Sequence, residues 1–209
     1  MDISILEMNF LCQILDKTSL YGFESFSMLT SNQAQEVKNS LYKKDILDEN
    51  YSLTNKGLKI LEVLELYVNA QEFLKFGKNS IFAKYQESEY VLITKLENTF
   101  SINLVNQDQI VVIILSKFDN WDTLTNTDHK KRLLLGNKFV EFMNNNADLK
   151  AIFLLRVNIE NNLESNIVMY INDGYFNCFD AKSKQLDMYS RNDVQQAITD
   201  VISSDWGIN

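Results

Sequence analysis

The sequence of 209 residues contains no proline, six glycines, two cysteines and one histidine. The glycines are isolated from one another, so the chain has neither a P-loop nor a dinucleotide-binding fingerprint. The single histidine, His129 in "NTDHKK", has no partners at the spacing that a zinc site or a catalytic triad requires, and we interpret it as a solvated residue. We therefore expect a protein that is not an enzyme and needs no cofactor or metal.

Long apolar runs and positive charge are also scarce. The longest strongly apolar run, "IVVIIL" at residues 110–115, is far shorter than the roughly 18 residues of a membrane helix. The first residues carry Asp2 and Glu7 where a secretory signal carries Lys or Arg. The net charge of -8 repels nucleic-acid phosphates and anionic lipids. We expect a cytoplasmic protein that does not bind nucleic acid and does not insert directly into a membrane.

Hydrophobic residues make up 45% of the chain, so a packed core is expected. Cys12 and Cys178 lie in the apolar stretches "NFLCQIL" and "YFNCFD". Because cysteine is among the most buried residue types and the compartment is expected to be reducing, we predict two buried, reduced thiols rather than a disulfide.

The first seventy residues have helical periodicity. Spacings of three and four positions predict a first helix whose apolar side is formed by Ile3, Leu6, Phe10 and Ile14. A second helix is predicted over residues 31–43, capped by Thr30 or Ser31, and a third begins after Thr54. The apolar positions of the third helix are Leu58, Leu61, Leu64 and Val68.

Beyond Ala70, short runs rich in β-branched and aromatic residues predict an antiparallel meander. These runs are residues 80–85, 90–97, 100–105 and 109–115. In the third run, Phe100, Ile102 and Leu104 alternate with polar residues, which predicts one apolar and one polar face. The run "IVVIIL" does not alternate, and we predict a central strand that is covered on both sides.

The second half repeats this plan. A helix is predicted over residues 128–144, and a closing helix over residues 192–202. Between them, strand-like runs occupy residues 151–159, 165–172, 175–181 and 185–190, with "NDG" at 172–174 as the strongest hairpin signal. The predicted fold is α+β, a single domain over residues 1–209 with N-terminal helices, a C-terminal helix and a pseudo-twofold arrangement of helix plus antiparallel β-meander. The two quasi-repeats are predicted at about 54–116 and 127–203.

The stretch "LYKKDILDENYSLTNKGLKIL", residues 41–61, is by itself typical of winged-helix DNA-binding proteins. Between positions 31 and 70, however, five lysines face six acidic residues, so the basic excess of a DNA-binding surface is missing. We interpret the stretch as structural, with its turn on the surface. Its predicted core residues are Ile46, Leu47, Leu53 and Leu58.

Taken together, this order of elements resembles the EspG-type family of type VII (ESX) secretion chaperones. The resemblance rests on the acidic turn "ILDEN", the leucine-rich helix "LTNKGLKILEVLELYVNA" and the meander runs "SIFAKY", "YVLITKLE", "FSINLV" and "QIVVIIL", and it covers nearly the whole chain. Length and composition are similar to firmicute-type members that escort a secreted nuclease toxin. The chain departs from actinobacterial members in its lack of proline and glycine and in its short loops.

The resemblance implies a cytosolic chaperone or adaptor that binds a secreted substrate, such as the N-terminal targeting region of a toxin, and delivers it to the membrane-bound secretion ATPase. Small helical-hairpin proteins secreted with the substrate are further implied partners. Two alternatives from other classes are an immunity or antitoxin-like protein, in which acidity would cover a basic nuclease face, and a winged-helix regulator. An enzyme of unrecognised type is a weaker alternative.

Large aromatic residues suggest where a partner would bind. Phe82, Tyr85 and Tyr90 lie on predicted meander strands, and a wide antiparallel sheet has a second face that a partner can use. Phe118 and Trp121 lie in a polar loop, where a large aromatic side chain either packs against the core or anchors a partner. We predict these five residues as the partner-binding set.

Overall fold

The computed structural model describes residues 2–120, 123–126, 130–134, 136–146, 150–160 and 163–203. The chain divides into two compact units, one formed by Met1–Ala70 and Asn79–Leu104 and the other by Gln71–Lys78 and Val105–Asn209. We call them the first unit and the second unit. Among the described residues, no helix is both long enough and apolar enough to span a bilayer.

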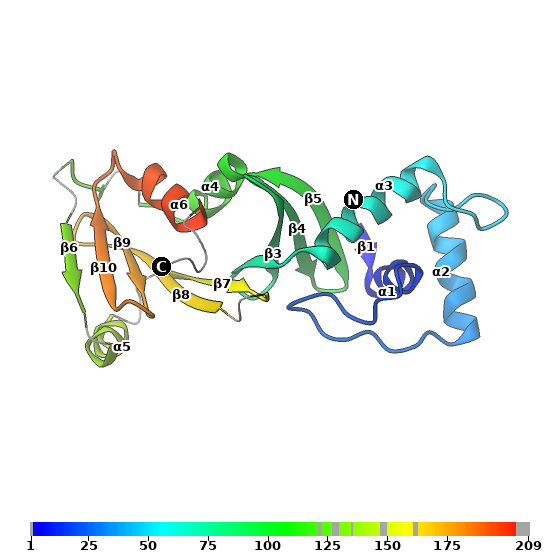
Figure 1. Ribbon diagram of the computed structural model, residues 1–209, viewed down its shortest axis with the longest axis horizontal. Helices are drawn as coiled ribbons and strands as arrows, with labels where there is room; N and C mark the ends of the chain where they lie inside the picture. Colours follow the sequence, from blue (N-terminus) through cyan, green and yellow to red (C-terminus); the bar gives the residue numbers. More distant parts are fainter. Residues whose placement is uncertain are drawn as a thin grey trace. The chain divides into compact units, whose positions relative to one another are not determined.

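In the first unit, three helices accompany a sheet with strand order β1-β5-β4-β3 (Figure 1). The helices are α1 (Ile5–Ile14), α2 (Ser31–Lys43) and α3 (Asn55–Asn69). The strands are β1 (Asp2–Ser4), β3 (Ser80–Gln86), β4 (Glu89–Leu96) and β5 (Thr99–Asn106), whose last two residues belong to the second unit. Helix α1 packs against α2, and α3 packs against β3 and β4.

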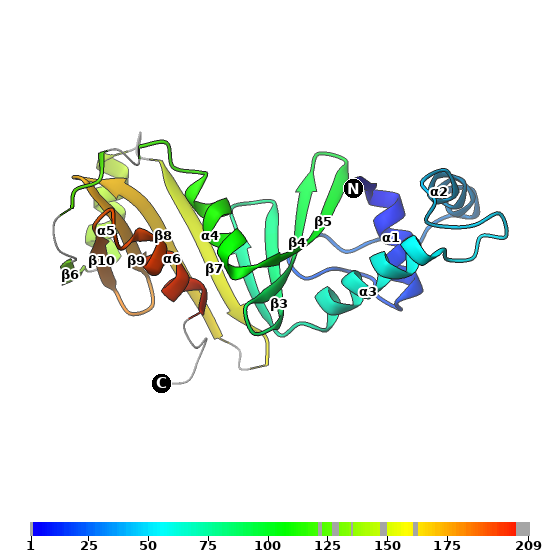
Figure 2. The same ribbon diagram turned by 90° about the horizontal axis from the view of Figure 1, so that it is seen from above.

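In the second unit, a sheet has helices on both faces, and its strand order is β2-β7-β8-β9-β10-β6. The strands are β2 (Glu72–Phe76), β6 (Lys130–Leu133), β7 (Ala151–Asn158), β8 (Leu163–Asn172), β9 (Tyr175–Asp180) and β10 (Gln185–Tyr189). The helices are α4 (Gln107–Leu115), α5 (Gly136–Asn145) and α6 (Val194–Ser203). Phe139 of α5 packs on one face of the sheet, with Val168, Tyr170 and Phe179. Helices α4 and α6 contact each other (Figure 2), and α6 is tied to the opposite face through a hydrogen bond from Arg156.

The element order confirms the α+β class and the repeated plan. A helix, four strands and a helix occur twice, first from α3 to α4 and then from α5 to α6. The strand pairs β1–β5, β3–β4, β2–β7, β7–β8, β8–β9, β9–β10 and β10–β6 are all antiparallel. The residue bounds of the two quasi-repeats and the single domain over residues 1–209 remain predictions.

The predicted central strand "IVVIIL" is wrong, because residues 107–115 form α4. A capping box starts this helix: the Asn106 side chain accepts a hydrogen bond from the Gln109 amide (2.9 Å), and the Gln109 side chain accepts one from the Asn106 amide (2.9 Å). Ile110 and Ile114 are buried at helical spacing, whereas Val112 is 64% exposed. A six-residue apolar run does not separate strand from helix, and the cap decides between them.

The predicted helix over residues 128–144 is too long at its start, because residues 130–133 form β6. Pairing with β10 extends this segment, so tertiary hydrogen bonding overrides local helix preference. Strand β2 was not predicted from the sequence. By contrast, Asp173 and Gly174 have positive φ angles of 51° and 76°, which confirms the hairpin turn at residues 172–174.

The first helix is present, but its predicted buried side is wrong. Ile3 lies in β1, and Leu6 and Ile14 are exposed. Met8 and Leu11 are buried instead. The helix begins only after the Ser4 cap, which fixes its rotation relative to α2. Of the two cap candidates for α2, Thr30 is the cap, and Thr54 caps α3 as predicted. Both cysteines are buried and free.

In the stretch at residues 41–61, Ile46 and Leu47 are buried as predicted, and Leu53 is half-buried. Leu58 is 46% exposed, so its predicted core position is wrong. It lies on the outer side of α3, one residue from the buried Gly57. The turn between Leu47 and Leu53 closes through a β-bridge, and its tip is exposed as predicted.

A buried carboxylate joins α1 to α2. The Glu7 side chain is 1% exposed and accepts hydrogen bonds from the Ser4 amide (2.6 Å), the Ser40 hydroxyl (2.8 Å) and the Lys44 ammonium (2.6 Å). Burial by itself raises the pKa of Glu7, but the hydrogen bonds from Lys44, Ser4 and Ser40 and the charge of Lys44 outweigh it, so the pKa lies below its ordinary value. The ionised form of Glu7 therefore stabilises the fold.

We expect Glu7→Gln to lower the free energy of unfolding at pH 7 by about 2 kcal/mol, because charged hydrogen bonds are lost and Lys44 is left without its counterion. The lowered pKa means that this stabilisation is fully present above the unfolded-state pKa and is lost as the pH falls through the folded-state value. The difference between wild type and variant should therefore narrow below about pH 4.5. Urea unfolding across this range measures it, with Glu36→Gln at an exposed position of α2 as the control. Equal stability of the two variants at pH 7 would contradict the role of Glu7.

The first turn of α3 lies very close to the chain that follows α2. A Cβ atom on Gly57 would lie 2.3 Å from the Ile46 carbonyl oxygen and 3.0 Å from Leu53 Cδ2. We expect Gly57→Ala to lower the melting temperature and to cost about 1–3 kcal/mol, as overpacking usually does. The control is Gly136→Ala at the start of α5, where a Cβ meets nothing within 4 Å and the helix propensity improves. Two variants of equal melting temperature would refute the close approach.

Candidate functional site

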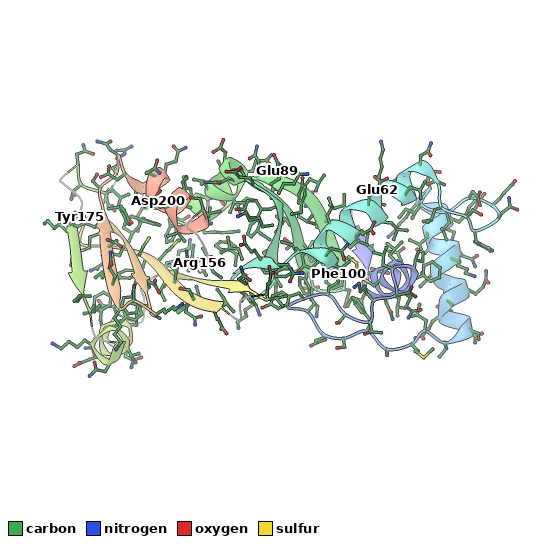
Figure 3. All side chains as sticks on the ribbon, in the orientation of Figure 1. Glu62, Glu89, Phe100, Arg156, Tyr175 and Asp200 are labelled. Carbon is green, nitrogen blue, oxygen red and sulfur yellow. The ribbon has the colours of Figure 1, made fainter. Side chains whose placement is uncertain are left out.

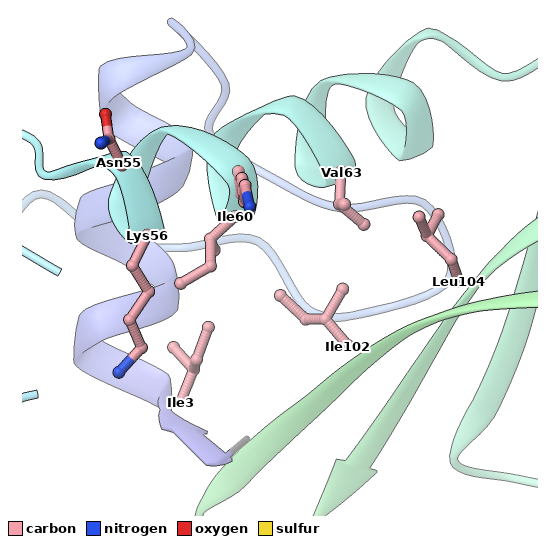
Figure 4. Close-up of a pocket in the computed structure, with 8 residues that line it drawn as sticks. Ile3, Asn55, Lys56, Ile60, Val63, Ile102 and Leu104 are labelled. Atoms are coloured by element: carbon pink, nitrogen blue, oxygen red, sulfur yellow. The ribbon is translucent and has the colours of Figure 1, made fainter. Parts of the chain in front are cut away.

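An apolar groove lies in the first unit between α3 and the strands β1 and β5 (Figure 4). Its volume is about 460 Å³. Ile60 and Val63 point from α3 toward the strands, and Ile3 and Ile102 point from the strands toward α3. The remaining lining residues are Asn55, Lys56, Lys59 and Leu104. The groove is therefore lined by side chains of a helix on one side and of a sheet face on the other.

The strand side of the groove is covered at one end and open at the other. Phe100, on the same face of β5, is buried and makes an edge-to-face contact with Phe23 at 5.3 Å between ring centroids. Further along the strand, Ile102 is half-buried and Leu104 is 50% exposed. The alternation read from the sequence is present, but part of this apolar face has no cover within the described first unit.

The helix side of the groove ends in positive charge. Lys56, Ile60 and Val63 are spaced as i, i+4 and i+7, so they form one stripe along α3, with Lys59 beside it. Both lysines are exposed. None of the eight described residues that line the groove is acidic, although the whole chain has a net charge of -8. A local basic rim thus borders an apolar surface.

The Glu7 network supports both sides of this groove. Lys44 donates from its ammonium to Glu7 and to the Asp2 carbonyl oxygen (3.0 Å), which lies next to Ile3. The Lys44 carbonyl oxygen in turn accepts a hydrogen bond from the Lys56 ammonium (2.6 Å). One lysine therefore links β1, α1 and the first turn of α3.

A second cavity, of about 380 Å³, lies in the second unit between the sheet and α6. Arg156 and Asp200, labelled in Figure 3, lie on its lining together with Asp180. Arg156 donates to the Val201 carbonyl oxygen (3.1 Å) and to the Ser165 hydroxyl (3.4 Å), and Ser165 donates to Asp180 (3.1 Å). These contacts hold α6 on the sheet, which is a structural role. Within the described parts of the chain, no cluster of three or more His, Cys, Asp or Glu side chains could hold a metal.

The predicted partner-binding residues do not meet in one site. Phe82 and Tyr90 are buried at 0% and 1% exposure, and Phe118 is buried against Phe176 at 5.3 Å between ring centroids. Each of these three side chains packs in the core of its own unit, which for Phe118 is one of the two alternatives that the sequence left open. Tyr85 is half-buried near the end of β3, and Trp121 lies outside the described residues. None of the four described residues lines the groove, and their part in partner binding remains a prediction.

The sequence carried one signal for the groove. Helix α3 carries apolar residues on two sides, whereas a helix with a single buried face needs them on only one. Leu61 and Leu64 face the core, and Ile60 and Val63 face the groove. A helix that is apolar on two sides needs two partners. The contribution of Ile3 was hidden, because its strand consists of only three residues.

Two sequence relatives show significant similarity to part of the chain. Both are named Type VII secretion system protein EsaE, from the Staphylococcus aureus strains USA300 and NCTC 8325 / PS 47. Each is 30% identical over 95 residues, which are 44% of this chain and 41% of the relative. The matched region therefore spans about two fifths of the length of these curated relatives.

A solved structure matches the whole chain at the level of the fold. It is the Mycobacterium tuberculosis type VII secretion system chaperone EspG5 in complex with a PE25-PPE41 dimer. The TM-score is 0.65, with coverage of 100% of this chain and 98% of EspG5, at 7% sequence identity. This similarity confirms the EspG-type fold that the sequence predicted.

A family described as a domain of unknown function, DUF5081, matches residues 2–201. The match includes both walls of the groove and nearly every described element. The chain therefore belongs to the DUF5081 family and has the fold of EspG5.

Proposed function

We propose that this protein is a cytoplasmic chaperone or adaptor that binds a substrate of a type VII secretion system and delivers it to the secretion ATPase. The observation that carries the proposal is the agreement of two comparisons, since the sequence similarity leads to EsaE and the fold similarity leads to EspG5. Both are named as proteins of type VII secretion. The proposed client is the N-terminal targeting region of a secreted toxin, accompanied by small helical-hairpin partners.

The chemistry of the surface suits such a role. A chaperone of this kind needs no reacting groups, but it needs a preformed apolar surface that covers part of its client and later releases it. The groove between α3 and β5 provides apolar side chains that are already ordered by packing within the first unit. Binding through this surface needs neither ATP nor a cofactor, so release would depend on competition from the next partner.

A second candidate, an immunity protein, is favoured by the net charge of -8, which would complement a basic nuclease face. The basic rim of the groove, formed by Lys56 and Lys59, does not suit that role. The two functions differ in which end of the toxin is bound.

We expect the full chain, co-expressed with a secreted toxin from the same type VII locus, to copurify with the toxin's N-terminal region and not with its isolated toxic domain. Retention in about 0.5 M salt, where charge interactions are strongly screened, is expected because the contact is largely apolar. Affinity capture followed by size-exclusion chromatography measures this, and adding the purified ATPase domain tests for a ternary complex. Capture of the toxic domain alone, with loss of its activity, would instead establish an immunity function.

A further inference from the structure

The groove of the first unit combines a helical ridge, an open strand face and a basic end. From this combination we infer that it binds one face of an amphipathic α-helix of the client, with acidic residues of that helix beside Lys56 and Lys59. The inference rests on the proposed function for the identity of the client, and it deepens that proposal by naming the site and the kind of segment that is bound.

The size and lining of the groove fit a row of side chains. Its volume of about 460 Å³ lies in the range of roughly 300–1,000 Å³ that is usual for ligand pockets. Ile3, Ile60 and Val63 form walls whose positions are set by strand pairing and by the helix, and Leu104 leaves the open end half exposed. Such a site accepts a few aliphatic side chains from two turns of a helix.

A helix fits this groove better than an extended peptide because of backbone hydrogen bonding. The groove is formed over the face of the sheet, and its central lining consists of the aliphatic side chains of Ile60, Val63 and Ile102. An extended peptide would leave its amides and carbonyls without partners there, at a high free-energy cost. A helix satisfies its own backbone and presents only side chains, as in other helix-in-groove complexes.

The positive charge of Lys56 and Lys59 at the end of the groove favours acidic residues on the bound helix. Lys56 is held in place by its hydrogen bond to the Lys44 carbonyl oxygen, and Lys59 is exposed one helical turn away. Because no lining residue is acidic, a helix with carboxylates at this end is attracted and one with lysines is repelled. The rim therefore contributes orientation, and the aliphatic walls contribute most of the affinity.

The test uses the full chain and two kinds of partner. One is the N-terminal region of the co-expressed toxin, and the other is a synthetic helical peptide with leucines at i, i+3, i+4 and i+7 and glutamates on their flanks. A second peptide carries lysines in place of the glutamates. The groove variant is Val63→Asp at a half-buried position, and the control is Leu58→Asp, since Leu58 lies on the same helix, is exposed and does not line the groove.

We expect Val63→Asp to weaken binding of both the toxin region and the glutamate peptide at least tenfold in fluorescence anisotropy, with Leu58→Asp unchanged. Lys59→Glu should weaken the glutamate peptide and strengthen the lysine peptide, whereas Lys43→Glu, an equal change in charge on α2 outside the groove, should change neither. Circular dichroism and thermal unfolding establish that each variant is folded. If Val63→Asp does not fold, Ile102→Asn replaces it.

The outcomes separate the two proposals. Toxin binding that survives Val63→Asp overturns the groove site and leaves the chaperone function standing. Binding of the glutamate peptide in the groove without toxin binding overturns the function and supports the helix site. If the wild-type chain binds neither the toxin region nor the glutamate peptide, both proposals are overturned. If the wild-type chain forms a dimer and Val63→Asp dissociates it, the groove is an interface between two copies of the chain. That outcome also overturns the helix site.

Discussion

The architecture of the first unit depends on a carboxylate that is buried near the start of the chain. Glu7 would be costly in the interior if it stood alone, because an ion loses its hydration on burial. The Ser4 amide, the Ser40 hydroxyl and the Lys44 ammonium compensate for that loss, and each comes from a different part of the chain. The requirement that all three reach one carboxylate fixes β1, α1 and α2 relative to one another. The Lys44 carbonyl oxygen also accepts a hydrogen bond from Lys56 of α3. This polar network therefore fixes the positions of the elements on both sides of the groove.

The sequence predicted most elements because their signals are local. Thr30 and Thr54 cap helices where hydroxyl residues precede apolar stripes, and Gly174 marks a hairpin because the turn requires positive φ. The predictions were wrong where contacts with residues far away in the sequence determine the local structure. Residues 130–133 are extended by pairing with β10, and the exposed position of Leu58 follows from the close approach of Gly57 to Ile46. The candidate site depends almost entirely on such distant contacts, so its one signal in the sequence was the second apolar side of α3, formed by Ile60 and Val63.

The groove offers a physical route to reversible binding. Its apolar walls supply attraction that does not depend on a single residue, and its two lysines reject clients of the wrong charge. The aromatic side chains of Phe82 and Tyr90 lie in the core, and their part in partner binding remains a prediction. The residues that form the proposed binding surface are smaller and aliphatic, which suits a site that must release what it binds.

The division of the chain also has a consequence for biosynthesis. Strand β2 belongs to the second unit, yet the residues before and after it, up to Ala70 and from Asn79, belong to the first. Its partner β7 lies far along the chain, and the Asn158–Glu72 contact spans 86 positions. Phe73 and Leu74, which are buried in the finished protein, therefore lack the pairing of β2 with β7 on the nascent chain until β7 has been synthesised.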